Sequence, residues 1–148
     1  MKTLITAMKT SISEVMETMF YLPVEFGNQS PFSETGVNEA DRFSACRLKF
    51  SGDFSGQFIL AMPKDLMAVM AENFMGESID DLTEEHLVGT LTETLNMVSG
   101  NTLSKLDSEN PFELDTPQSV DISKIPANYP FMVIDTTVSA MAIHVTIN

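Results

Sequence analysis

Residues 93–101 read Glu93-Thr94-Leu95-Asn96-Met97-Val98-Ser99-Gly100-Asn101, and they lie in the longest segment of the chain with a helical pattern. At about 100° per residue, the apolar residues of this segment gather on one side of a helix, namely Leu87, Val88, Leu91, Leu95, Val98 and Leu106. The opposite side then carries Gly89, Glu93, Asn96 and Gly100. The segment therefore predicts a long helix that packs with one side and presents a small polar stripe with the other.

The two glycines of this stripe are unexpected in a helix. A glycine in a helix interior costs roughly 1 kcal/mol relative to alanine, and Gly89 and Gly100 lie on the same side as Glu93 and Asn96. Gly100 and Asn101 interrupt the helix-favouring run without ending its apolar pattern. We interpret the stripe as a helix face whose backbone a binding partner approaches closely.

Length and charge narrow the class of protein. A chain of 148 residues suits one domain, 1–148. Its net charge of −13 disfavours binding to nucleic acid or to anionic membranes. Cys46 is the single cysteine, which fits a reducing compartment, and we expect it to be a small core residue. No apolar run approaches the roughly 20 residues of a membrane span, and Met1 to Lys9 are too weakly apolar for a secretory signal. We therefore expect a cytoplasmic protein.

The first part of the chain predicts a helix followed by strands. Apolar residues recur at three- and four-residue spacing through the first twenty residues, and Pro23 ends that helix. Residues 27–36 predict an irregular or weakly extended connection. Two strands are expected over Phe43 to Phe50 and Gly56 to Met62, joined by a turn.

A short helix over Lys64 to Phe74 ends the first part at Gly76. The second part repeats the order of helix and strands, and Asp80 or Asp81 is expected to cap its long helix from about Thr83 to Leu106. The rest is expected to be extended, in segments listed here by their bounds: Phe112 to Ile122, Phe131 to Ile134 and Val138 to Ile147. The pattern predicts an α+β fold in which long helices pack on an antiparallel-rich sheet.

The two parts resemble each other, with the first half at about 1–76 and the second at about 77–148. Residues 13–19 can be laid over residues 92–98. Glu14 then corresponds to Glu93, while Glu17 stands where the second half has Asn96. The layout predicts a duplicated, pseudo-two-fold domain in which only the second half keeps the Glu–Asn pair.

Other kinds of active site find little support. The chain has two histidines, His86 and His144, and no Ser-His-Asp or Cys-His spacing. The carboxylates Glu84 and Glu85 adjoin His86 in sequence, so these three cannot converge on a metal from one helix face. A Glu–Asn pair can orient a water and hold a cation, but it supplies no nucleophile. If the pair catalyses a reaction, its partner must bring the reactive group.

The motif Glu93-x-x-Asn96-x-x-x-Gly100-Asn101, on a long helix that follows a short one, resembles the signature of the CheC/CheX/FliY family of chemotaxis phosphatases. The duplicated layout, which spans nearly the whole chain, is similar too. In that family CheC-type members carry two such motifs, and CheX-type members carry one in the second half. Because Glu17 replaces the first-half Asn, the chain resembles the CheX type.

The resemblance implies an enzyme that hydrolyses the aspartyl-phosphate of a CheY-like response regulator. Asn96 would orient the attacking water beside the phosphoryl group, and Glu93 would pair with the regulator's active-site lysine. An acyl phosphate is already reactive and needs positioning more than a strong base. The chain would need no cofactor of its own, because the regulator would bind Mg²⁺. The helical wheel leads us to expect that Gly89 and Gly100 contact this partner, and that Asn101 supports the helix structurally.

The resemblance also implies a homodimer joined through sheet edges. The segment Val138 to Ile147 supplies such an edge in one interpretation and an internal strand in another. Two other functions stay open: a non-catalytic adaptor of the same fold, which binds a response regulator or belongs to a flagellar switch as the FliM middle domain does, and an unrelated acidic domain with an accidental motif. Loss of phosphate from a phosphorylated regulator would distinguish them.

Overall fold

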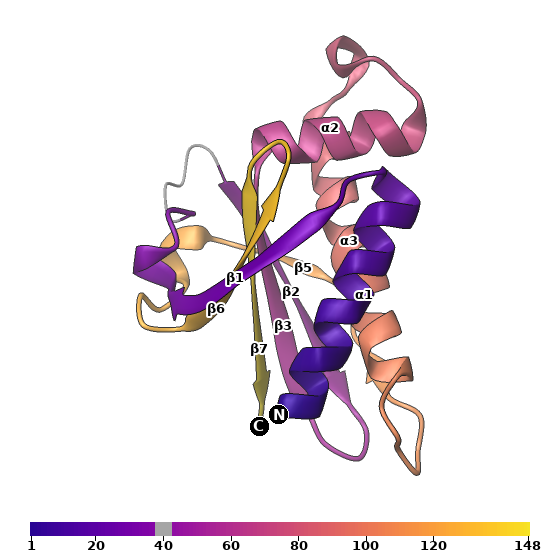
Figure 1. The fold of residues 1–148 in the computed structure, drawn as a ribbon, viewed down its shortest axis with the longest axis vertical. Coiled ribbons are helices and arrows are strands. Elements are labelled where there is room, and N and C mark those ends of the chain that lie inside the picture. The colour runs from indigo at the N-terminus through magenta and orange to yellow at the C-terminus, as the bar shows by residue number, and fades with distance from the viewer. Residues whose placement is uncertain (38–42) are drawn as a thin grey trace.

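The computed structural model describes residues 1–37 and 43–148, and it places three helices on one face of an antiparallel sheet (Figure 1). The helices are α1 (Lys2–Phe20), α2 (Lys64–Met75) and α3 (Glu84–Ser104), with short 3₁₀ turns at Phe32–Glu34, Ile79–Asp81 and Ile122–Lys124. The strands are β1 (Val24–Pro31), β2 (Phe43–Ser51), β3 (Gly56–Pro63), β4 (Glu113–Leu114), β5 (Gln118–Val120), β6 (Pro130–Thr136) and β7 (Ala140–Ile147). The expected α+β class is confirmed.

The sheet interleaves the two halves of the chain. Its strand order is β1-β6-β7-β3-β2-β4, and β5 also pairs with β2. The β2–β3 and β6–β7 hairpins lie at the centre, where β3 pairs with β7. Each hairpin receives its outer strand from the other half, because β1 pairs with β6 and β4 and β5 pair with β2. This exchange gives the pseudo-two-fold arrangement that the repeated layout predicts.

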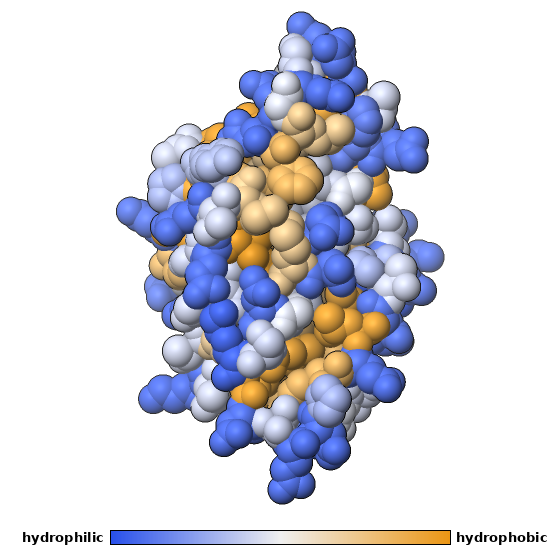
Figure 2. All heavy atoms as spheres, turned by 90° about the vertical axis from the view of Figure 1, so that its right-hand side faces the viewer, coloured by the Kyte–Doolittle hydropathy of each residue, from blue (hydrophilic) through white to orange (hydrophobic). Residues whose placement is uncertain are grey.

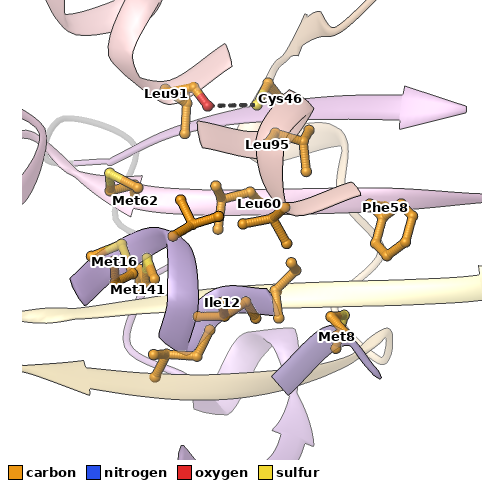
Figure 3. Close-up of a cluster of buried hydrophobic side chains, with 14 of the residues drawn as sticks. Met8, Ile12, Met16, Cys46, Phe58, Leu60, Met62, Leu91, Leu95 and Met141 are labelled. Atoms are coloured by element: carbon orange, nitrogen blue, oxygen red, sulfur yellow. Dashed lines mark hydrogen bonds between the residues drawn. The ribbon is translucent and has the colours of Figure 1, made fainter. Parts of the chain in front are cut away.

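The main core lies between the helices and the sheet. Every second residue of the central strands points into it, and α1 and α3 cover these side chains (Figure 3). The residues labelled there are Met8, Ile12 and Met16 of α1, Cys46 of β2, Phe58, Leu60 and Met62 of β3, Leu91 and Leu95 of α3, and Met141 of β7. Cys46 is fully buried, its Sγ lies 3.8 Å from the carbonyl oxygen of Leu91, and burial raises its pKa to about 12. Cys46 is therefore the core residue that its position in the sequence predicts.

The long helix begins at a capping box. The Thr83 hydroxyl accepts a hydrogen bond from the backbone N–H of His86, and His86 Nδ1 accepts one from the backbone N–H of Thr83, both at 3.2 Å. The prediction that Asp80 or Asp81 caps this helix was wrong, because both aspartates lie in the preceding 3₁₀ turn and Thr83 is the N-cap. Thr83 is closer to the first helical turn and brings His86 as its reciprocal partner.

The first helix runs beside α3 in the opposite direction (Figure 1). Glu14 of α1 forms a 2.9 Å ion pair with Lys105, which follows the last turn of α3. Phe20, at the other end of α1, lies near the first half of α3. The helix ends at Phe20 and is capped by Tyr21, which has a left-handed backbone conformation with φ 58° and lies two residues before Pro23.

The sheet decides two expectations about strands. The segment expected to be an irregular or weakly extended connection, residues 27–36, contains most of β1, which is a regular partner of β6 apart from a bulge between Phe26 and Gln29. At that bulge a Cβ on Gly27 would lie 3.4 Å from the Val133 carbonyl oxygen, so a glycine suits the close approach of the two strands. Of the two interpretations of Val138 to Ile147, the internal strand is confirmed, because β7 lies between β3 and β6.

The face of the sheet away from the helices holds a smaller cluster. It is built from Phe32, Val37, Ala45, Ile59, Ala61, Ile122, Ile125, Phe131 and Ala142. His144 is buried beside it, with its ring stacked on Tyr129 and Phe131 at 4.7 and 5.2 Å between ring centroids. Its Nδ1 lies 2.8 Å from the carbonyl oxygen of Pro130, and burial lowers its pKa. His144 therefore belongs to the interior of the fold.

Candidate functional site

The outward side of α3 carries the polar stripe. Gly89, Glu93 and Asn96 are exposed and Gly100 is partly exposed. Glu93 and Asn96 are three residues apart, so their side chains leave the helix from one face, with Cβ atoms about 5–6 Å apart. The division of α3 into a packed side and an outward side therefore matches the helical wheel.

The packed side of α3 differs from the wheel in two respects. Val88 was grouped with the core residues but is 37% exposed, because it lies at the edge of the apolar stripe. Hydroxyl residues fill places between the leucines, and the buried set is Thr90, Leu91, Thr94, Leu95, Val98, Ser99, Thr102 and Leu103. The threonine hydroxyls donate to carbonyl oxygens one turn earlier, for example Thr94 to Thr90 at 2.6 Å. Small hydroxyl residues thus let α3 lie close to the sheet and to α1.

The Glu93 and Asn96 side chains are free to meet another molecule. Within residues 1–37 and 43–148, neither forms a hydrogen bond or an ion pair with the rest of the chain. Asn101 is exposed, and its backbone carbonyl oxygen accepts the Ser104 hydroxyl at 2.9 Å in the last turn. A carboxylate accepts from cations, and an amide both donates and accepts. Together they can hold a cationic group and orient a water molecule.

The two glycines of the stripe have different surroundings. A Cβ at Gly89 would meet nothing within 4 Å, so no part of the described chain requires a glycine there. A Cβ at Gly100 would lie 3.7 Å from Leu114 Cδ1, which is an ordinary contact. Neither glycine is therefore needed for packing within the chain, and both cost helix stability.

An apolar groove adjoins the stripe and was not predicted from the sequence. Its volume is about 520 Å³, and its lining residues are Phe20 of α1, Phe74 and Met75 of α2, and Glu85, His86, Gly89, Thr90, Glu93 and Met97 of α3. Phe74 and Met75 are 49% and 40% exposed. Figure 2, which views the helical side, shows apolar surface between hydrophilic residues. The only sequence signal was two large apolar residues directly before the helix stop at Gly76.

The equivalent stripe on α1 is arranged differently. Glu14 and Glu17 are both exposed and three residues apart, as the alignment with Glu93 and Asn96 predicts. The Glu14 carboxylate, however, is held by Lys105 at 2.9 Å. A carboxylate at 17 in place of an amide offers no hydrogen-bond donor to a water or a phosphoryl oxygen. The first half therefore lacks the combination of groups that the second half presents.

We next consider metal-ligand clusters and membrane-spanning helices among the described residues. No group of three or more His, Cys, Asp or Glu side chains among residues 1–37 and 43–148 converges as metal ligands would. None of the helices in the described segments has both the length and the apolar character needed to cross a bilayer. The buried ionisable groups Cys46 and His144 lie in the interior of the fold.

Comparison with solved structures identifies the fold. A chemotaxis protein CheX from Vibrio vulnificus superposes with a TM-score of 0.75 at 16% identity, covering 98% of this chain and 96% of that one. The CheX of a CheX–CheY–BeF3–Mg²⁺ complex from Borrelia burgdorferi gives 0.72 at 17% identity, covering 98% and 97%. Thermotoga maritima FliY gives 0.60 at 13% identity, covering 93% and 82%. At these identities the likeness establishes a shared fold.

A family model describes the sequence itself. No curated protein matches the chain. The model of the chemotaxis phosphatase CheX matches residues 44–143, which is more than half of the chain and includes all of α3. With the same fold and one Glu–Asn stripe on α3, the chain belongs to the CheX family of chemotaxis phosphatases.

Proposed function

We propose that this chain hydrolyses the aspartyl-phosphate of a CheY-like response regulator, with Asn96 and Glu93 as the site residues. The observation that carries the proposal is the unpartnered, outward pair on α3: both side chains are exposed and neither is engaged by the described part of the chain. Membership of a phosphatase family supports the reaction class. The Borrelia complex supports a CheY-like partner, because beryllofluoride mimics a phosphoryl group.

The pair suits the chemistry of an acyl phosphate. The bond between phosphorus and the aspartyl oxygen is already labile, so the barrier is lowered mainly by positioning. The Asn96 amide carbonyl accepts a hydrogen bond from water and aims its oxygen at phosphorus, opposite the aspartyl oxygen, while the amide N–H donates to a phosphoryl oxygen. The new O–P bond forms as the old one breaks, which yields inorganic phosphate and the regulator's free carboxylate. No base stronger than the phosphoryl oxygens is required.

Glu93 has the docking role in this proposal. It forms an ion pair with the lysine beside the regulator's phosphorylation site. This ion pair fixes the position of the Asn96 side chain relative to phosphorus. Because Gly89 and Gly100 have no side chains, the regulator's loops can approach the helix backbone at these two positions. The exposed Asn101 supports the last turn of α3. Mg²⁺ is bound by the regulator and neutralises charge on the phosphoryl group.

A homodimer remains part of the proposal. If two copies join through sheet edges, the edges are β1 or β4 with β5, because β7 is internal. A cytoplasmic location follows from the proposed partner.

The test follows phosphate loss from phosphorylated CheY-like receiver domains of the same organism. Wild type is expected to accelerate the loss, and Asn96→Ala to reduce the rate at saturation by about 100- to 1,000-fold, the range for removal of one preorganised hydrogen-bonding group. The matched control is Glu17→Ala on α1, which should keep the wild-type rate. Binding by wild type without acceleration would instead establish the non-catalytic adaptor.

A further inference from the structure

We infer that the groove beside Glu93 is the specificity pocket of the docking face, and that it receives an apolar side chain of the response regulator close to the lysine that Glu93 pairs with. This inference rests on the proposed function, since it names how the same partner is selected. It concerns residues of α2 that the catalytic proposal does not use.

The walls of the groove come from three helices. Phe20 at the end of α1 forms the buried floor, while Phe74 and Met75 at the end of α2 form one wall. The Phe20 and Phe74 rings are 5.9 Å apart between centroids and tilted by 50°. The opposite wall is a stripe along α3, formed by His86, Gly89, Thr90, Glu93 and Met97. The groove is therefore held by packed helices and does not depend on a loop.

The groove continues the proposed catalytic stripe. Gly89 and Glu93 belong to both, and Asn96 follows Glu93 by less than one turn. A regulator that pairs a lysine with Glu93 must cover part of the groove at the same time. Because Gly89 leaves that wall without a side chain, the groove is open toward this partner.

The residues that line the groove indicate which kind of side chain it can bind. The exposed part of Phe74 and Met75 is apolar surface that the described chain leaves uncovered. Two carboxylates, Glu85 and Glu93, line the groove, and both are exposed. An apolar side chain with a cation next to it matches this pattern, whereas an acidic or purely polar segment does not. Methionine adapts its shape to the side chain it receives, which suits Met75 and Met97 to this place.

The groove also distinguishes the α3 side from the α1 side. α2 links β3 to α3, and its Phe74 and Met75 line the groove together with residues of α3. Neither Glu14 nor Glu17 is among the residues that line this groove. Docking at α3 combines an ion pair with apolar burial, which is the combination that gives hot spots in protein interfaces.

The experiment separates docking from catalysis with four single substitutions. Phe74→Glu and Met75→Glu place a negative charge on the wall, and both residues are exposed enough for the charge to reach water. Phe74→Ala and Met75→Gln repeat the test with milder changes in case a charge disturbs the fold. Ile147→Glu is the matched control, because Ile147 is 37% exposed and ends β7.

Two readouts are needed, namely the Kd for receiver domains charged with beryllofluoride and Mg²⁺, and KM and kcat for dephosphorylation. The groove variants are expected to raise Kd and KM at least tenfold while kcat stays within twofold of wild type. Ile147→Glu should change neither, and Asn96→Ala should lower kcat without raising Kd. Glu85→Lys should slow association and reduce its dependence on ionic strength.

Other outcomes overturn the inference in distinguishable ways. An unchanged Kd in all four groove variants removes the groove from docking; if these variants also weaken self-association in sedimentation, a second copy occupies it. A lower kcat with unchanged Kd would make the groove part of catalysis. Wild type that binds without accelerating phosphate loss contradicts the proposed function, yet Kd still decides the role of the groove. If wild type binds no receiver domain, both proposals fail.

Discussion

The outward faces of α1 and α3 share a sequence pattern but differ in their chemical properties. Each presents an acidic residue followed three positions later by a second polar residue, and the helices lie side by side on one sheet. On α1 the carboxylate of Glu14 is engaged by Lys105, and Glu17 offers only acceptors. On α3 the carboxylate of Glu93 has no partner among the described residues and lies beside a groove. The α3 face thus differs from the α1 face in three respects: it has an amide at the second position, its carboxylate has no neighbouring cation in the described segments, and an apolar wall lies beside it.

Removal of the two equivalent carboxylates should affect activity on α3 and not on α1. Glu93→Ala is expected to lower kcat/KM for dephosphorylation by about 10- to 100-fold, because the regulator's lysine loses its partner. Glu14→Ala should leave kcat/KM unchanged and cost at most about 1 kcal/mol of stability, since its ion pair with Lys105 is partly exposed. Steady-state kinetics and urea unfolding measure the two effects. Equal losses of activity in both variants would mean that the two faces act alike.

The halves should also differ in how pH affects stability. Cys46 in the first half has a folded pKa of about 12, raised by burial from 9.0, so the folded state holds its proton longer than the unfolded state. The contribution of Cys46 to the free energy of unfolding is therefore fully present below pH 9. It should fall by on the order of 1 kcal/mol per pH unit between pH 9 and pH 12. Urea unfolding of wild type and Cys46→Ala at pH 8 and pH 10 measures this contribution as a difference. Equal slopes in the two proteins would contradict it.

His144 in the second half should act on the acid side. Burial lowers its pKa in the folded state, so the unfolded state binds the proton more readily. Its contribution is present above the unfolded value near 6.5 and is lost as pH falls through the folded pKa. The same comparison with His144→Gln at pH 7.5 and pH 5.5 should show a smaller acid loss in the variant than in wild type.

The smallest expected effect concerns a residue that α1 lacks. The α1 sequence contains no glycine, whereas α3 carries Gly89 on its outward stripe. Gly89→Ala should raise the free energy of unfolding by about 0.5 to 1 kcal/mol, because a Cβ there meets open space and alanine favours the helix. It should at the same time weaken binding to the regulator, whose approach the added methyl obstructs. A stabilised variant with unchanged Kd would show that close approach at Gly89 is not required.

Much of the fold follows from local patterns in the sequence. Both long helices, the short helix before Gly76 and the central hairpin strands have clear periodicity and clear end signals, and the structure places them within a few residues of their predicted bounds. The outward positions of Glu93 and Asn96 also follow from periodicity alone. Their catalytic and docking roles stay predictions, because they depend on a second molecule.

The features that the sequence did not predict depend on contacts between residues that are distant in the chain. β1 contains a glycine at its bulge and alternates poorly, so its pairing with β6 is decided by residues about a hundred positions later. Thr83 competes with Asp80 and Asp81 for the cap, and local preference does not rank them. The groove needs Phe20, Phe74 and Met97 to meet, although no local pattern joins them.

The interleaved sheet has a consequence for how the chain is made. A ribosome releases the N-terminal end first, yet β1 cannot pair until β6 has emerged, and α1 has no α3 to lie against for some eighty residues. During that interval the apolar face of α1, with Leu4, Met8, Ile12 and Met16, has no complete core to enter. The sheet therefore closes late, through contacts of large sequence separation that fold slowly. Until α3 and β6 have emerged, the apolar face of α1 is a surface that a chaperone can bind.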